Sequence, residues 1–325
     1  VRNGVTLIAN GGVNGAAGGS IKFLDEYGTF SRDILGNPRV KVFGNGVLDT
    51  SLSQGAIIAS LDGNGNVLLG DTGLSVSAFH KDLISNFSGI IQGGAPASGG
   101  LVIGGTMTLS GANTYGGHTD IAGTGAVGFI NNTSGSGTGT GEVRALFGGT
   151  LGGNGTIAGP VIVTGLSVPG LMAFLAPGGT ATSTGTLTIQ STLTFSNGIY
   201  DFELNSDTGT ADKVIADGVT IPDSIFGESL FSFTDLGQSL LTIGTEFTVI
   251  ENTSLSLIDG TFGNLRGGFV FTGDFNTFEV DYKGGDGNDL TLTVRKSANV
   301  PDGGTTLSLL TLAVSGLTLL RRMIA

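Results

Sequence analysis

Residues 105–121, with the sequence GTMTLSGANTYGGHTDI, constrain the fold of this chain more than any other stretch. Threonine alternates with methionine and leucine over residues 106–109, which predicts a short strand with one buried face. Residues 110–113 (SGAN) are typical of a turn, and the pair Gly116 and Gly117 predicts a tight corner. A short strand, a corner and a second short strand predict one coil of a stacked parallel β-solenoid.

The composition supports a fold with many corners between apolar strands. Glycine accounts for 60 of the 325 residues, well above its usual share of about 7%. A collagen triple helix is excluded because glycine has no three-residue period and there are only 7 prolines. The hydrophobic share of 39% and mean hydropathy of +0.30 argue against disorder. Cysteine is absent, which excludes a disulfide framework, a thiol nucleophile and a cysteine-ligated metal.

The net charge of −12 is unevenly distributed along the chain. Residues 1–199 carry nine acids and seven bases, residues 200–294 carry sixteen acids and three bases, and the remainder carries four bases and one acid. An acidic block of this size argues against nucleic acid as a partner. We expect the acids to keep an exported protein soluble, and binding of divalent cations is the alternative.

The strand–corner pattern recurs on both sides of residues 105–121. Residues 57–70 (IIASLDGNGNVLLG), 149–157 (GTLGGNGTI) and 185–195 (GTLTIQSTLTF) repeat it. This spacing predicts coils of roughly 20–25 residues, with threonine on the outer side of the strands. Residues 74–86 have a loosely helical spacing of apolar residues, and a short helix there is an alternative.

These segments resemble the autotransporter-associated β-strand repeat, whose typical run is GTLTLSGANTYTGGTT. Further pieces of that family's pattern resemble residues 60–70, 87–91, 260–262 and 282–289, so the resemblance covers about residues 55–294. It implies an all-β parallel β-solenoid, specifically a right-handed β-helix, of the kind found in cell-surface passenger proteins.

The strands expected after residue 197 are longer and richer in phenylalanine. Residues 199–204, 244–250, 268–272, 277–282 and 289–294 alternate as strands do, and we interpret them as the terminal part of the solenoid, widened and capped by antiparallel strands that block its exposed edge. We therefore divide the chain into a solenoid (1–197), a terminal solenoid and capping region (198–294) and a tail (295–325). The chain starts at Val1 without a signal segment, and we expect a fragment or a processed chain.

The tail contains the most specific functional motif. A Pro-Gly hinge precedes a charge-free apolar run over residues 305–320, which predicts a short helix about 24 Å long. A pair of arginines follows and is expected on the cytoplasmic side of a membrane. The tail resembles PEP-CTERM sorting signals of the VPDSG type, with glycine in place of the usual serine. The predicted sorting residues are Val300, Pro301, Asp302, Gly303, Gly304, Arg321 and Arg322.

This resemblance implies a sorting protease or transpeptidase of the exosortase type as partner, and membrane attachment before processing. We expect an exported protein of a diderm bacterium, on the cell surface, the outer membrane or in the extracellular matrix. Its expected role is structural or adhesive, with surface polysaccharide or neighbouring cells as further partners.

The sequence predicts no catalytic, cofactor-binding or metal-binding residue. His80 and His118, the two histidines, are expected at the surface, and no GxSxG nucleophile motif occurs. Residues 284–289 (GGDGND) resemble half of a calcium-binding RTX repeat, but one copy is more typical of a hairpin turn. A polysaccharide-degrading β-helix enzyme, a lyase or hydrolase, is the alternative. It would need clustered carboxylates, and acids are sparse before residue 200.

Overall fold

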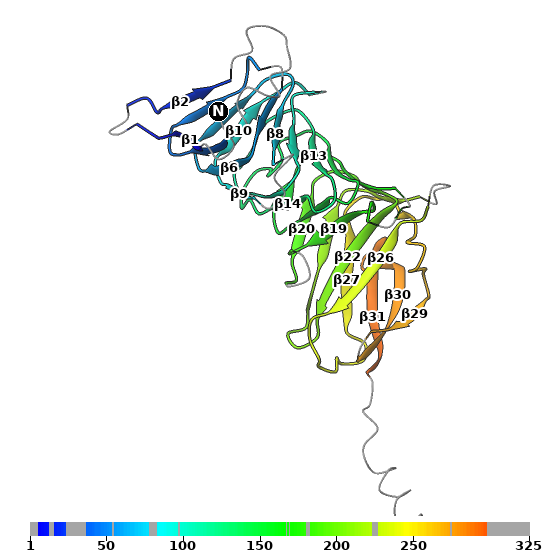
Figure 1. The fold of residues 1–325 in the computed structure, drawn as a ribbon. Helices are drawn as coiled ribbons and strands as arrows, with labels where there is room; N and C mark the ends of the chain where they lie inside the picture. The colour runs from blue at the N-terminus through cyan, green and yellow to red at the C-terminus, as the bar shows by residue number, and fades with distance from the viewer. Residues whose placement is uncertain are drawn as a thin grey trace, which may run out of the picture.

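The computed structural model describes residues 6–12, 16–23, 37–53, 55–77, 83–96, 98–166, 168, 170–179, 183–222, 227–273 and 275–297. They form an elongated stack of β-strands that runs from β1 near the N-terminus to β31 (Figure 1). The described residues contain no helix. The predicted all-β class and the stacking of parallel strands are therefore confirmed.

Three faces run along the stack, and the chain visits them in turn. Strands of the first face pair in parallel in this order: β1 (Thr6–Ala9), β3 (Arg39–Val42), β6 (Ser60–Gly63), β9 (Ile84–Phe87), β12 (Thr106–Leu109), β14 (Val127–Ile130), β16 (Thr150–Gly153), β19 (Ala173–Pro177), β22 (Gly198–Asn205) and β26 (Leu230–Asp235). The short β23 (Thr210–Ala211) pairs antiparallel with β22.

The second face is built in two sections. The first section contains β2 (Ser20–Lys22), β4 (Val47–Asp49), β7 (Asn66–Leu69) and β10 (Ile90–Gly93). The second section contains β17 (Thr156–Ile157), β20 (Thr186–Ile189), β24 (Lys213–Ala216) and β27 (Glu246–Asn252). The coils that begin with β12 and β14, which are described throughout, have no strand on this face.

The third face is continuous and parallel. It contains β5 (Ala56–Ile58), β8 (Leu74–Val76), β11 (Leu101–Ile103), β13 (Thr119–Ala122), β15 (Val143–Leu146), β18 (Val161–Thr164), β21 (Leu193–Ser196), β25 (Val219–Ile221) and β28 (Asp259–Gly260). The stack is closed by an antiparallel cap on β27, which contains β31 (Asp289–Ser297), β30 (Asn276–Gly284) and β29 (Val270–Thr272).

From β3 to β22 the register of the first face confirms the predicted coil length of 20–25 residues, whereas the steps from β1 to β3 and from β22 to β26 are 33 and 31 residues. Asp62 on β6 accepts a hydrogen bond from the amide of Asn86 on β9, in the next coil, and the two residues are 24 residues apart. Within β12 the side chains of Met107 and Leu109 are buried, whereas the threonines between them face outward. This alternation gives each coil an apolar inner side that the next coil extends.

Close contact between coils explains the high glycine content. A Cβ atom on Gly117 would overlap the carbonyl group of Gly99 in the coil before, and one on Gly141 would overlap the carbonyl oxygen of Gly117. Neither residue has a positive φ angle. The predicted corner at Gly117 therefore requires glycine because backbones approach each other there, not because of its conformational freedom.

Asparagine replaces the missing strand of the second face in the coil that begins with β12. Asn113 is 4% exposed. Its Oδ1 accepts a hydrogen bond from the Ile91 amide (2.8 Å), and its Nδ2 donates to the Gly137 carbonyl (2.6 Å). One side chain thus satisfies backbone groups of the coil before and the coil after, which an interrupted ladder would leave unpaired.

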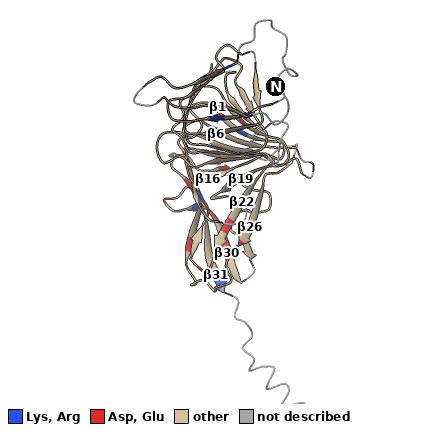
Figure 2. Ribbon diagram, turned by 60° about the vertical axis from the view of Figure 1, so that its left-hand side comes forward, with Lys and Arg blue, Asp and Glu red and all other residues tan. Residues whose placement is uncertain are grey.

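The coils widen after β22. The Gly198 amide donates to the Ser229 hydroxyl of the next coil, and these two residues are 31 residues apart. Aromatic rings fill the additional interior, and those of Phe195 and Phe262 are 5.0 Å apart, edge to face. Acidic residues are concentrated on this half, around β22, β26 and β30 (Figure 2). Parallel pairing continues to β28, and the expected antiparallel strands form the cap.

The alternative helix over residues 74–86 is wrong at both ends, because Leu74–Val76 and Ile84–Phe87 are strands that pair with neighbouring coils. Pairing with adjacent coils overrides the weak helical spacing there. The apolar helix expected at residues 305–320 lies outside the described residues.

Candidate functional sites

The predicted sorting residues Val300–Gly304, Arg321 and Arg322 lie outside the described part of the chain. The cap strand β31 ends at Ser297, so the motif begins directly after the solenoid. No helix long and apolar enough to cross a bilayer occurs among the described residues.

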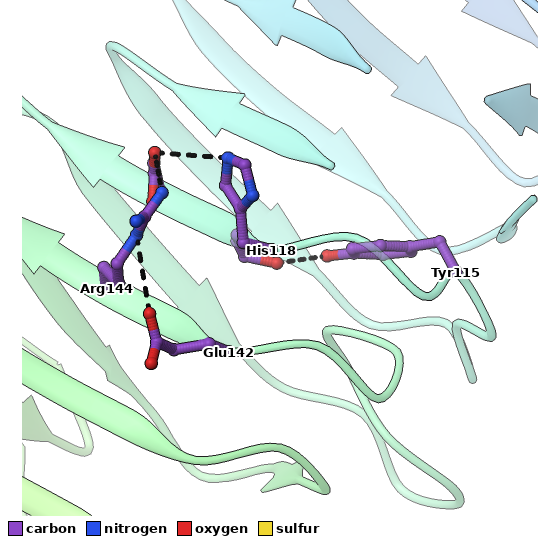
Figure 3. Close-up of polar contacts among 6 residues, drawn as sticks. Tyr115, His118, Glu142 and Arg144 are labelled. Atoms are coloured by element: carbon purple, nitrogen blue, oxygen red, sulfur yellow. Dashed lines mark hydrogen bonds and ion pairs between the residues drawn. The ribbon is translucent and has the colours of Figure 1, made fainter. Parts of the chain in front are cut away.

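A charged cluster on the third face is the densest group of ionisable side chains between β11 and β18 (Figure 3). Asp120 on β13 and Arg144 on β15 are direct cross-strand neighbours. The Arg144 guanidinium donates two hydrogen bonds to the Asp120 carboxylate, from Nε at 2.6 Å and from Nη2 at 2.8 Å. Because Asp120 accepts these bonds, it raises the pKa of Arg144, which carries its charge throughout the accessible pH range.

His118 and Glu142 complete the cluster from the residues that precede these strands. The Nε2 atom of His118 lies 3.5 Å from an Asp120 oxygen, and Arg144 Nε lies 3.8 Å from Glu142. The side chains of His118, Arg144 and Glu142 are 26%, 33% and 38% exposed, whereas that of Asp120 is 14% exposed. His118 therefore reaches the surface, as expected, although it also contacts a carboxylate.

The tyrosine of the SGANTY turn has a structural role. Tyr115 is fully buried, and its hydroxyl lies 2.6 Å from the Thr119 hydroxyl, which is also buried (Figure 3). Burial raises the pKa of Tyr115 far above its ordinary value. Neither hydroxyl is accessible to a substrate, so this pair anchors the corner that leads into β13.

The arrangement favours a structural ion pair over a catalytic group. Both Asp120 oxygens are engaged by Arg144, so Asp120 is poorly suited to act as a general base. The cluster was not predicted from the sequence because Asp120 and Arg144 are 24 residues apart. This spacing equals one coil, but only the register between β13 and β15 shows that the two side chains are neighbours. His80 lies outside the described residues.

The GGDGND segment forms the turn between β30 and β31, as the hairpin interpretation predicted. Gly284 pairs with Asp289 across the turn, and Oδ1 of Asp289 accepts a hydrogen bond from the Asn252 amide (2.9 Å). Within the described ranges, no three His, Asp or Glu side chains lie close enough to hold a metal ion.

Comparison with known families identifies one segment of the chain. Residues 299–324 match the VPDSG-CTERM motif. The match includes every predicted sorting residue, from Val300 to Arg322. A VPDSG-CTERM tail implies an exported cell-surface protein that is processed by an exosortase-type sorting system. No curated protein matches the chain.

Proposed function

We propose that this chain is a non-enzymatic rod, built as a right-handed β-solenoid, with a structural or adhesive role on the cell surface or in the extracellular matrix of a diderm bacterium. The observation that carries the proposal is the VPDSG-CTERM tail, which follows a stack of parallel coils and its antiparallel cap. Such a stack makes a long, regular outer surface from a short repeating unit, which suits a spacer or a multivalent binder.

Two residues of the GANTY turn have identified structural roles, and these roles support a relationship between this chain and the autotransporter-associated repeat. Asn113 and Tyr115 of the GANTY turn join adjacent coils and bury the corner. We propose that this run is retained for assembly of the coils, and that binding residues lie among the outward-facing threonine side chains, such as Thr106 and Thr108. The proposed ligands are surface polysaccharide or neighbouring cells.

Tail function is tested by Pro301→Ala and by deletion of Arg321 and Arg322 in the full chain, followed by cell fractionation. We expect both variants to accumulate in the membrane fraction, because the hinge and the basic anchor are needed for recognition and orientation. Lys296→Ala, just before the motif, is the control. Surface delivery unchanged from that of the parent in both variants would contradict the sorting proposal.

The adhesive role is tested with the purified chain on a glycan array and in a cell-adhesion assay. We expect salt-tolerant, weak retention on polysaccharide that strengthens when the chain is displayed in many copies. Lack of retention on every surface would leave only the structural role. The enzyme alternative predicts release of reducing ends from pectin-like polymers, and we expect none.

A further inference from the structure

Glu203 and Asp212 are the two most deeply buried carboxyl side chains in the described part of the chain, at 1% and 0% exposure. Glu203 lies near the end of β22, and Asp212 lies between β23 and β24. They meet at the corner where the chain passes from the first face to the second face, in the coil at which the stack begins to widen.

Asp212 joins two coils through its carboxylate. Oδ1 accepts a hydrogen bond from the Gly185 amide (2.8 Å), just before β20, and Oδ2 accepts one from the Glu203 amide (3.0 Å). The Asp212 amide in turn donates to the Glu203 carbonyl (2.8 Å). At other corners neutral asparagine has this role, as Asn154 does in accepting the Thr186 amide (3.0 Å).

The buried Glu203 side chain lies beside the Asp212 carboxyl group, and a hydrogen bond from it is among the causes that raise the pKa of Asp212. Two ionised carboxylates lack a donor and repel each other, so this contact requires a proton on one of them. Burial and the hydrogen bond from Glu203 raise the pKa of Asp212 to about 9. The two carboxyl groups titrate together, because ionisation of one makes ionisation of the other less favourable.

The surrounding charged groups do not replace that proton. Tyr200, also on β22, donates its hydroxyl to the Val249 carbonyl (3.0 Å), and its pKa is raised by burial, with Asp212 and Glu203 adding to the effect. The Lys213 ammonium, next to Asp212 in the sequence, pairs with Glu251 on β27 (2.9 Å). From β26, Asp235 accepts the Ser206 amide (3.0 Å). The segment before β20 contributes the Gly185 amide and the neutral Thr184.

We propose that Glu203 and Asp212 share one proton and form a pH-sensitive clamp between the coil of β20 and the coil of β22. While the proton is present, the corner is closed by the two backbone amides that donate to Asp212 and by the contact between the two carboxyl groups. When it is lost, two negative charges face each other in the interior, and the hairpin of β22 and β23 separates from the segment before β20. This device is independent of the proposed role of the tail.

The direction in which stability depends on pH follows because the folded state binds the shared proton more tightly than the unfolded chain does. An exposed aspartate releases it near pH 3.8, whereas the folded pair keeps it up to about pH 9. The stability that the pair contributes is complete below pH 3.8, declines as the pH rises through this window and is lost above about pH 9. The clamp therefore favours the folded state in acid.

The test is thermal unfolding of the full chain between pH 5 and pH 10, for the parent and for Glu203→Gln. A glutamine amide keeps a donor toward Asp212 at every pH, so we expect the fall of the unfolding midpoint with rising pH to be much smaller in the variant. Asp201→Asn, two residues earlier on the same strand and half-exposed, is the matched control and should retain the parental profile. Asp289, whose pKa is also raised by burial, contributes equally to all three proteins.

A second measurement applies even if Glu203→Gln folds poorly. Infrared spectroscopy of the folded parent at pH 7 should show the carbonyl band of a buried protonated carboxyl group, and titration should remove it near pH 9. Absence of that band, or a parental pH profile in Glu203→Gln, would overturn the proposal.

Discussion

The N-terminal coils (residues 39–196) and the C-terminal region (residues 198–297) share one architecture but differ in what fills it. In the N-terminal coils Asp62 meets Asn86, 24 residues later, and the interior is mainly valine, leucine and isoleucine. In the C-terminal region Gly198 meets Ser229, 31 residues later, and the interior contains a network of aromatic rings. The first region is almost neutral, whereas the second contains most of the acids.

This difference shows that coil length and core side-chain volume change together. A longer coil encloses a wider interior, and only large aromatic side chains fill it without leaving cavities. In the last coil the outer edge of β27 pairs with β31, and β30 and β29 continue this antiparallel cap. Between the two ends of the stack, each strand of the continuous third face pairs with the coil before and the coil after.

The largest effect should come from the close approach of backbones in the narrow coils. Gly117→Ala places a Cβ atom against the backbone of Gly99 and Gly100, neither of which can move away. We expect a loss of at least about 4 kcal/mol in the free energy of unfolding, measured by denaturant titration. Gly116→Ala at the adjacent residue and Gly267→Ala in the C-terminal region should have little effect, because a Cβ atom at either position makes only ordinary contacts of 3.4 Å or more. Equal losses at Gly116 and Gly117 would contradict this account of the corners.

Removal of a ring from the wide interior should be nearly as damaging. Phe262 is fully buried and contacts Phe195, Tyr200 and Phe231. Phe262→Ala should lower the free energy of unfolding by about 3–5 kcal/mol, through lost transfer energy and a residual cavity. Phe269→Ala, at a ring that is 48% exposed, is the control. A loss at Phe262 no larger than that at Phe269 would show that the aromatic network is not needed to fill the coil.

Both regions use an amide side chain where strand pairing is interrupted, and this similarity limits the contrast between them. Asn113 joins Ile91 to Gly137, and Asn264 bonds both the amide and the carbonyl of Phe231 at 2.8 Å. Asn113→Ala should cost about 2–3 kcal/mol, because buried backbone groups lose their partners, whereas Asn264→Ala, at an exposed residue with partly buried partners, should cost about 1 kcal/mol. Chemical denaturation of both variants, with the exposed Asn86→Ala as control, measures the effect. A cost confined to one region would show that the two interruptions are stabilised differently.

The smallest effect is expected at the charged cluster. The Asp120–Arg144 pair is bidentate and partly exposed, so a double-mutant cycle should give a coupling of about 1 kcal/mol or less, reduced by added salt. In the C-terminal region the Glu228–Arg266 pair is 4.0 Å apart and more exposed, and it should show no measurable coupling. A larger coupling at the second pair would reverse the order that geometry predicts.

Much of the fold could be predicted from local sequence. The alternation in Thr106–Leu109 determines which side chains face inward, and the repeated spacing predicts the length of the narrow coils. The turn over residues 284–289 could also be predicted, because glycine and asparagine strongly favour turn conformations. The sorting motif is also a contiguous string, so a family match could identify residues 299–324.

What the sequence by itself determined is therefore whatever depends on neighbouring residues: strands, corners, the length of the narrow coils and the C-terminal motif. Only the tertiary structure decided which distant residues meet, as with Asp120 and Arg144 across one coil or Asp212 with Gly185. The physical reason is that coils differ in length, so the register between coils is set by packing and hydrogen bonding of the whole stack. The proton shared by Glu203 and Asp212 follows from that register, because burial and mutual proximity, not residue type, keep the pair protonated.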